Sequence, residues 1–180
     1  MWKHSFLGLS LALFAAGFSF AQDPAANFPK PGPEHAKMKE LVGDWDAVMT
    51  MESPEGKMTS KCTATYKSIC GGMWIASDFE GTLGPQKFQG HGLDGYDPVK
   101  KKYVGVWVDS MSGSPMSLEG AQDKDGKLVM TGETSGHDGK PQKVKTITEM
   151  KDKDHFTFKF YMVVEGKEVP AFTIDYTRKK

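Results

Sequence analysis

The chain has 180 residues, with 23 basic and 23 acidic side chains and a formal net charge of zero at pH 7. Such a balance lacks the positive surface that attracts nucleic acids or anionic membranes, so we expect no nucleic-acid partner. The length left after residues 1–21, which is 180 − 21 = 159 residues, suits one domain with a sizeable core.

The first 21 residues have the pattern of a signal peptide. Lys3 and His4 give a basic start, residues 6–20 are almost wholly apolar, and small residues end the segment at Ala21. The apolar run is shorter than the roughly 20 residues that span a bilayer, which favours cleavage over anchoring. We therefore predict a secreted or periplasmic protein that has no membrane attachment after cleavage.

Residues 22–33 carry four prolines and show no apolar periodicity, so they predict a disordered leader. The segment 34–41, "EHAKMKEL", is rich in helix formers, and Val42-Gly43 follows it. We expect a short helix there, at the start of a single β-barrel domain that covers residues 34–180.

From Trp45 onward the chain alternates apolar and polar residues in short runs separated by turn sequences such as "DKDGK" and "EGKE". The runs predict ten strands, over residues 44–52, 57–68, 73–82, 86–96, 102–109, 115–122, 127–134, 142–151, 155–164 and 169–179. Links this short favour antiparallel neighbours. Closure into an up-and-down barrel would remove both sheet edges and leave a cavity, whereas a two-layer sandwich is the alternative.

Two cysteines, Cys62 and Cys70, lie along one predicted strand. Eight extended residues span about 26 Å, at roughly 3.3 Å per residue. Disulfide-bonded cysteines need their Cα atoms about 4.4 to 6.8 Å apart. We expect both cysteines to be unpaired unless the chain turns between them.

The chain contains 22 lysines and a single arginine, Arg178, near the end of the last predicted strand. Arginine differs from lysine because its flat guanidinium can stack on an aromatic ring while it donates several hydrogen bonds. The first and last strands of an up-and-down barrel are neighbours, which would bring Trp45 beside Arg178. We predict that this pair is structural and closes one end of the barrel.

A short helix that leads into Gly-x-Trp at the first strand, with an arginine in the last strand, resembles the calycin superfamily of lipocalins, fatty-acid-binding proteins and nitrobindins. The segments "ELVGDW", "HGLDGYDPVKKKYVGVWVDSMSG", "ITEMKDKDHFTFKFYMVVEGKE" and "IDYTRK" are similar to the domain of unknown function 1579 family of exported bacterial proteins. The resemblance covers about Met38 to Lys179 and implies a calycin-like fold, but no particular reaction.

The resemblance to nitrobindins implies haem only where a histidine lies close to the C-terminus. Here the last histidine is His155, at the start of the ninth predicted strand, and the sequence departs from that pattern. The mature histidines are scattered, without the spacing of a metal site. We therefore expect neither haem nor another cofactor.

Candidate site residues gather on the fifth predicted strand, where Tyr103, Trp107 and Asp109 share one face. If Tyr96 pairs with Tyr103, then Gly92 and Gly90 lie opposite Trp107 and Asp109. Glycines at these positions would leave space beside the indole. Asp109 either fixes an amine or hydroxyl of a ligand at the rim of a pocket or caps the following loop.

Aromatic residues of the last two strands complete the predicted lining, namely Phe158, Phe160 and Tyr176. His91 could approach Asp109 only if the register shifted by one residue, because the pairing above places it on the other face. With that shift, the two would form an acid–base pair in the barrel mouth, and the protein could be an enzyme.

The sequence thus favours an all-β, ten-stranded antiparallel barrel that binds a small, partly apolar molecule as an exported carrier or sensor. Its predicted ligand-binding residues are Trp107, Asp109, Tyr103, His91, Phe158, Phe160 and Tyr176. Two alternatives stay open: an enzyme that uses the Asp/His pair, and a barrel that binds another protein or a second copy of itself.

Overall fold

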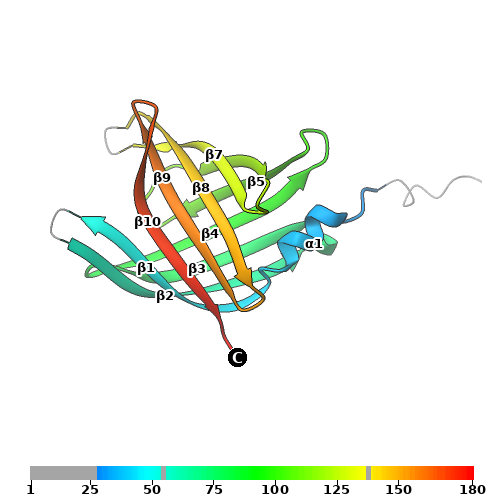
Figure 1. The fold of residues 1–180 in the computed structure, drawn as a ribbon, viewed down its shortest axis with the longest axis horizontal. Helices are drawn as coiled ribbons and strands as arrows, with labels where there is room; N and C mark the ends of the chain where they lie inside the picture. The colour runs from blue at the N-terminus through cyan, green and yellow to red at the C-terminus, as the bar shows by residue number, and fades with distance from the viewer. Residues whose placement is uncertain (1–27, 54–55, 137–138) are drawn as a thin grey trace, which may run out of the picture.

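The computed structural model describes residues 28–53, 56–136 and 139–180, and they form a closed antiparallel barrel of ten strands with one short α-helix before it (Figure 1). The elements are α1 (Pro33–Lys39), β1 (Gly43–Ser53), β2 (Gly56–Ile69), β3 (Trp74–Leu83), β4 (Gln86–Asp97), β5 (Lys102–Asp109), β6 (Met116–Gln122), β7 (Leu128–Ser135), β8 (Pro141–Asp152), β9 (His155–Val164) and β10 (Lys167–Arg178). Each strand pairs with its chain neighbours, and β10 returns to β1. The barrel predicted from the sequence is confirmed, and the sandwich alternative is wrong. The predicted signal peptide and most of the leader lie outside the described residues.

The alternation of side chains produces a barrel with an apolar inner face. In β9 and β10, Phe160 pairs with Phe172 and their rings stack with centroids 4.9 Å apart. The two strands are joined by Glu165 and Gly166, whose φ angles of 51° and 77° fit a tight primed hairpin turn. Short turns of this kind explain why successive strands are spatial neighbours.

The helix α1 lies at one end of the barrel, against β3 and β4 (Figure 1). Its inward residues, His35 and Met38, are buried, and His35 meets the ring of Tyr96 edge-on with centroids 6.1 Å apart. The hairpin turn between β5 and β6, after Asp109, lies at the opposite end. No helix in the described part of the chain is long and apolar enough to cross a membrane.

The seam between β1 and β10 is held by the pair predicted from the sequence. Trp45 and Arg178 are register partners, and the guanidinium carbon lies 4.0 Å from the centroid of the indole. The guanidinium donates hydrogen bonds to the backbone carbonyls of Glu40, Val42 and Lys153, at 2.8, 2.7 and 2.9 Å. One side chain therefore ties the end of α1, the β8–β9 turn and the last strand together.

The interior contains two apolar clusters. The larger surrounds Trp45 on β1, β2, β3, β9 and β10, and the smaller joins Met38 of α1 to residues of β3, β5 and β7. Tyr66 packs against both clusters. Cys62 is buried in the larger cluster, Cys70 is exposed, and both are free, as expected.

A candidate ligand site inside the barrel

The inner face of the barrel is unusually rich in glycine on one side. Five glycines take inward positions on β4 to β7: Gly90, Gly92, Gly105, Gly120 and Gly132. A glycine at an inward position withdraws a side chain from the interior, so a large ring or the neighbouring backbone can approach closely. This wall is therefore thinner than the aromatic wall opposite it.

The register predicted around Trp107 is confirmed: Tyr103 pairs with Tyr96, Trp107 with Gly92, and Asp109 with Gly90. The indole of Trp107 lies over Gly90, where a Cβ atom would collide with it. Trp107 is half-buried, so its ring keeps accessible surface.

Asp109 orients both the indole and the loop that follows. The indole Nε1–H of Trp107 donates to Asp109 Oδ2 at 3.0 Å, and the backbone N–H of Met111 donates to Asp109 Oδ1 at 2.8 Å. The hydrogen bond from Met111 shows that Asp109 caps the loop after β5, which was one of the two roles predicted for it. Because each carboxylate oxygen already accepts a hydrogen bond, Asp109 positions Trp107 as well as ending its strand.

His91 lies on the outer face, and its inclusion among the lining residues is wrong. Its side chain is 65% exposed, and its Nδ1 lies 2.8 Å from Asp78 Oδ1. It pairs across the ladder with Val108, while Asp109 pairs with Gly90, so the one-residue shift does not occur. His91 and Asp109 are therefore on opposite faces of the sheet and form no acid–base pair.

The remaining predicted lining residues all point inward, but they differ in exposure. Tyr103, Phe160 and Tyr176 are buried, and Tyr176 stacks on Phe156 with centroids 4.0 Å apart. Burial raises the pKa values of the Tyr103 and Tyr176 hydroxyls above their ordinary range. Phe158 is half-buried and keeps accessible surface. Phe158 and Trp107 therefore have more accessible surface for contact with a ligand than the buried rings of Tyr103, Phe160 and Tyr176.

Asp94 is the residue that the sequence interpretation missed. It lies on β4, opposite Ile75 and Gly105, and its carboxyl lies over Gly105 where a side chain at that position would otherwise sit. Asp94 is half-buried, and the burial of its carboxyl is the cause of its raised pKa. The carboxyl of Asp94 therefore lies on the inner face of β4 and keeps some accessible surface.

The carboxyl of Asp94 makes no hydrogen bond or ion pair with the residues that the structure describes, and burial alone raises its pKa from 3.8 to about 7. Its titratable neighbour Tyr66 has a raised pKa, first because it is buried and further because of the Asp94 charge. The hydroxyl of Ser77 is also close, since it lies where a Cβ of Gly92 would be. A buried carboxyl without a donor is costly to ionise.

A sequence signal for Asp94 exists in "HGLDGYD". The register that pairs Tyr96 with Tyr103 also places Asp94 in phase with Gly90 and Gly92, opposite Gly105. Charged residues are almost never buried without a partner, so an inward carboxyl between glycines is a signal of function.

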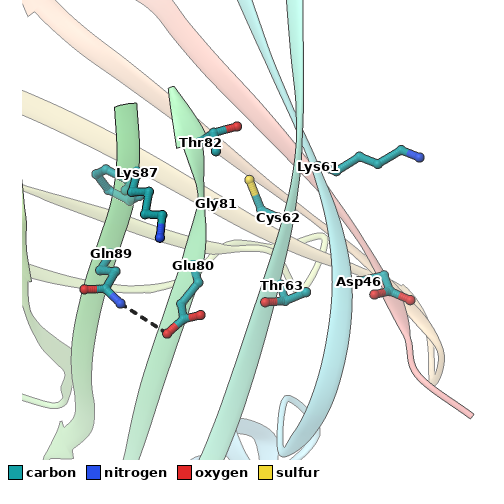
Figure 2. Close-up of a pocket in the computed structure, with 10 residues that line it drawn as sticks. Asp46, Lys61, Cys62, Thr63, Glu80, Gly81, Thr82, Lys87 and Gln89 are labelled. Carbon is teal, nitrogen blue, oxygen red and sulfur yellow. Dashed lines mark hydrogen bonds between the residues drawn. The ribbon is translucent and has the colours of Figure 1, made fainter. Parts of the chain in front are cut away.

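Two grooves lie on the outside of the barrel and do not include Asp94. The first, about 470 Å³, lies where the β2–β3 ladder ends at the pair Thr63 and Glu80. Figure 2 shows its residues, with the Cys62 thiol between the two strands and Glu80 bonded to Gln89. The second, about 730 Å³, lies beside Arg178 and the β8–β9 turn. Lysines and carboxylates are mixed in both, so neither selects a ligand charge.

No group of three or more His, Cys, Asp or Glu side chains in the described ranges could hold a metal ion. The polar groups around Gly92 and Gly105 on the inner face are the Asp94 carboxyl and the hydroxyls of Ser77 and Tyr66.

The ten-stranded closed barrel, with its leading helix and its Trp–Arg seam, is a calycin-like fold. Residues 30–178 match the model of the family described as "Protein of unknown function (DUF1579)", and the chain belongs to this family. A search of curated proteins finds no match. Among solved structures, the chain is similar to the S-type phycobiliprotein lyase CPES from Guillardia theta, with 12% identity, a TM-score of 0.57, and coverage of 82% of this chain and 93% of that one. At this identity the likeness shows the fold.

Proposed function

We propose that this protein is an exported barrel that binds a small, partly apolar molecule in its interior, as a carrier or sensor. The observation that carries the proposal is Asp94: an inward carboxyl, deep in the barrel, that keeps accessible surface and has no partner among the described residues. Ligand sites typically combine apolar walls with a few convergent polar groups, and Asp94 and Ser77 provide such groups here. The resemblance of the fold to a phycobiliprotein lyase supports the same proposal.

The route into the interior follows from the arrangement of the barrel ends. The helix α1 covers one end, next to Tyr96. Trp107 and Asp109 lie towards the other end, where Asp109 holds the indole against Gly90. A ligand that enters there would pass Trp107 before it reaches Asp94.

Export forms part of the proposal and rests on the sequence of residues 1–21. Expression of the full chain in a Gram-negative bacterium, followed by fractionation and intact mass, tests it. We expect a periplasmic product that begins at Gln22. A cytoplasmic product that retains Met1 would contradict this part of the proposal.

Native mass spectrometry of the exported protein tests ligand binding, together with a thermal-shift screen of small aromatic compounds. We expect a retained molecule or a screening hit, lost in Thr148→Phe, because Thr148 is half-buried and faces inward beside Phe158. Thr131→Phe is the matched control, because Thr131 is exposed on the outer face of β7. An empty protein that binds nothing in the screen would overturn the proposal.

A further inference from the structure

We propose that Asp94 binds the basic nitrogen of a flat, aromatic amine in the barrel interior. This inference rests on the proposed function and deepens it, because it states the chemical class of the ligand. It starts from the contrast between Asp94 and the other inward carboxyl considered above. Both oxygens of Asp109 accept hydrogen bonds from this chain, whereas those of Asp94 accept none from the described residues.

The described groups beside the Asp94 carboxyl, which include the Ser77 hydroxyl and the Trp107 ring, carry no positive charge. Gly92 and Gly105 flank it, with Oδ2 at 3.7 Å from the position that a Cβ of Gly92 would take. No lysine, arginine or histidine of the described ranges forms an ion pair with it. A positively charged donor for this carboxyl is therefore absent from the described residues.

A charged nitrogen fits the site better than a hydroxyl. Hydrogen bonds in which both groups are charged are roughly twice as strong as neutral ones, and the protein interior strengthens them further. The rings of Tyr66 and Trp107 also lie near the Asp94 carboxyl, and aromatic rings attract cations. Their flat walls favour a ligand whose apolar part is an aromatic ring.

Binding of a cation must displace a proton from Asp94. Burial raises the pKa of Asp94 to about 7, so a substantial fraction of the protein holds a proton there at neutral pH. The titratable groups around the carboxyl are the hydroxyls of Tyr66 on β2, Tyr96 on β4 and Tyr103 on β5, and burial raises the pKa values of Tyr66 and Tyr103. Because the pKa values of the Tyr66 and Tyr103 hydroxyls are raised above their ordinary value of 10.0, Asp94 is the group that releases the proton.

Matched probes test the inference. Phenyl, indole and naphthalene rings, each carrying an ethylamine, an ethanol or an acetate group, are titrated into the full chain by calorimetry at pH 8. We expect at least one amine to bind about tenfold more tightly than its alcohol, a difference of about 1.4 kcal/mol, and the acetate to bind most weakly. For that amine, we expect the affinity to fall about tenfold between pH 8 and pH 6, as Asp94 takes up its proton.

Variants separate Asp94 from general electrostatic effects. In Asp94→Asn we expect the preference for amine over alcohol to disappear, while alcohol binding stays within about threefold. Asp78→Asn is the matched control, because Asp78 lies on the outer face beside His91. This variant should keep the wild-type preference for amine over alcohol. If Asp94→Asn does not fold, proton release from the wild type replaces it. Calorimetry at pH 7 in buffers of different ionisation enthalpy should show proton release with the amine and none with the alcohol.

The outcomes distinguish this inference from the proposed function. If alcohols or acetates bind as tightly as the amines on every ring, or if no amine binds while the native protein retains another molecule, the amine inference is overturned and the binding function stands. If no probe binds and the native protein is empty, both are overturned.

Discussion

The barrel wall formed by β9, β10, β1 and β2 and the wall formed by β4 to β7 share one topology, but they fill the interior differently. The first wall supplies most of the larger apolar cluster, including Trp45, Phe156 and Tyr176. The second wall carries five inward glycines and the carboxyl of Asp94, which has no hydrogen-bond or ion-pair partner among the described residues. One side of the barrel is therefore filled by aromatic packing, whereas the other side is lined by glycines and carries an inward carboxyl.

We expect the largest loss of stability from a substitution at Trp45, at the seam between β1 and β10. Trp45 is fully buried, and replacement of a buried tryptophan by alanine costs about 3–5 kcal/mol. We expect Trp45→Ala to lower the free energy of unfolding by that amount in urea denaturation. Val48→Ala, on the exposed outer face of the same strand, should cost less than about 1 kcal/mol. Equal losses in the two variants would show that the seam does not carry the stability.

In the wall formed by β4 to β7, removal of the Asp94 charge should stabilise the protein. The pKa of Asp94 is about 7 in the folded state and about 3.8 as an ordinary carboxyl. Between these values the folded state binds a proton that the unfolded state lacks, so stability falls as pH rises and the fall is complete above about pH 8.

Asp94→Asn does not titrate, so it should become more stable than the wild type by roughly 1–3 kcal/mol at pH 8, with little difference at pH 4. Denaturation in urea at the two pH values measures this difference. A difference that does not change with pH would contradict the burial of an unpaired carboxyl.

A substitution at Gly90, in the wall formed by β4 to β7, tests how closely the Trp107 indole approaches the backbone. A methyl group at Gly90 would collide with the indole, which must then move away from Asp109. We expect Gly90→Ala to cost about 1–3 kcal/mol and to shift the NMR signal of the Trp107 Nε1–H group. Gly113→Ala meets nothing within 4 Å and should be nearly neutral. An unshifted indole signal in Gly90→Ala would contradict the close approach.

The smallest effect should come from the outer face. His91 is exposed and pairs with Asp78, and exposed ion pairs contribute about 0–1 kcal/mol. We expect His91→Ala to change the free energy of unfolding by less than about 0.5 kcal/mol and to leave ligand affinity unchanged. A tenfold loss of affinity would place His91 back in the site and break the distinction between the two faces.

Much of this fold could be predicted from the sequence because strand alternation and short turns are local signals. The register around Trp107 and the contact between Trp45 and Arg178 followed from the hairpin at Asp97 and from barrel closure. His91 was misplaced because its inclusion required a register shift that would have reversed the inward face of β4. The role of Asp94 was accessible from the same register, but its lack of a partner could be seen only when every neighbouring element was in place. The first outer groove depends on where the β2–β3 ladder ends, which no local pattern specifies.

Asp94 has an inward carboxyl whose pKa is raised by burial and which has no hydrogen-bond or ion-pair partner among the described residues. Titration of the aspartate side-chain carboxyl carbons by NMR, with the Asp94→Asn variant to assign the signal, tests it most directly. We expect one aspartate to titrate near pH 7 and its signal to be absent from the variant. If the Asp94 signal instead titrates near its ordinary value of 3.8, the carboxyl is hydrated or paired, and the account of the interior site is wrong.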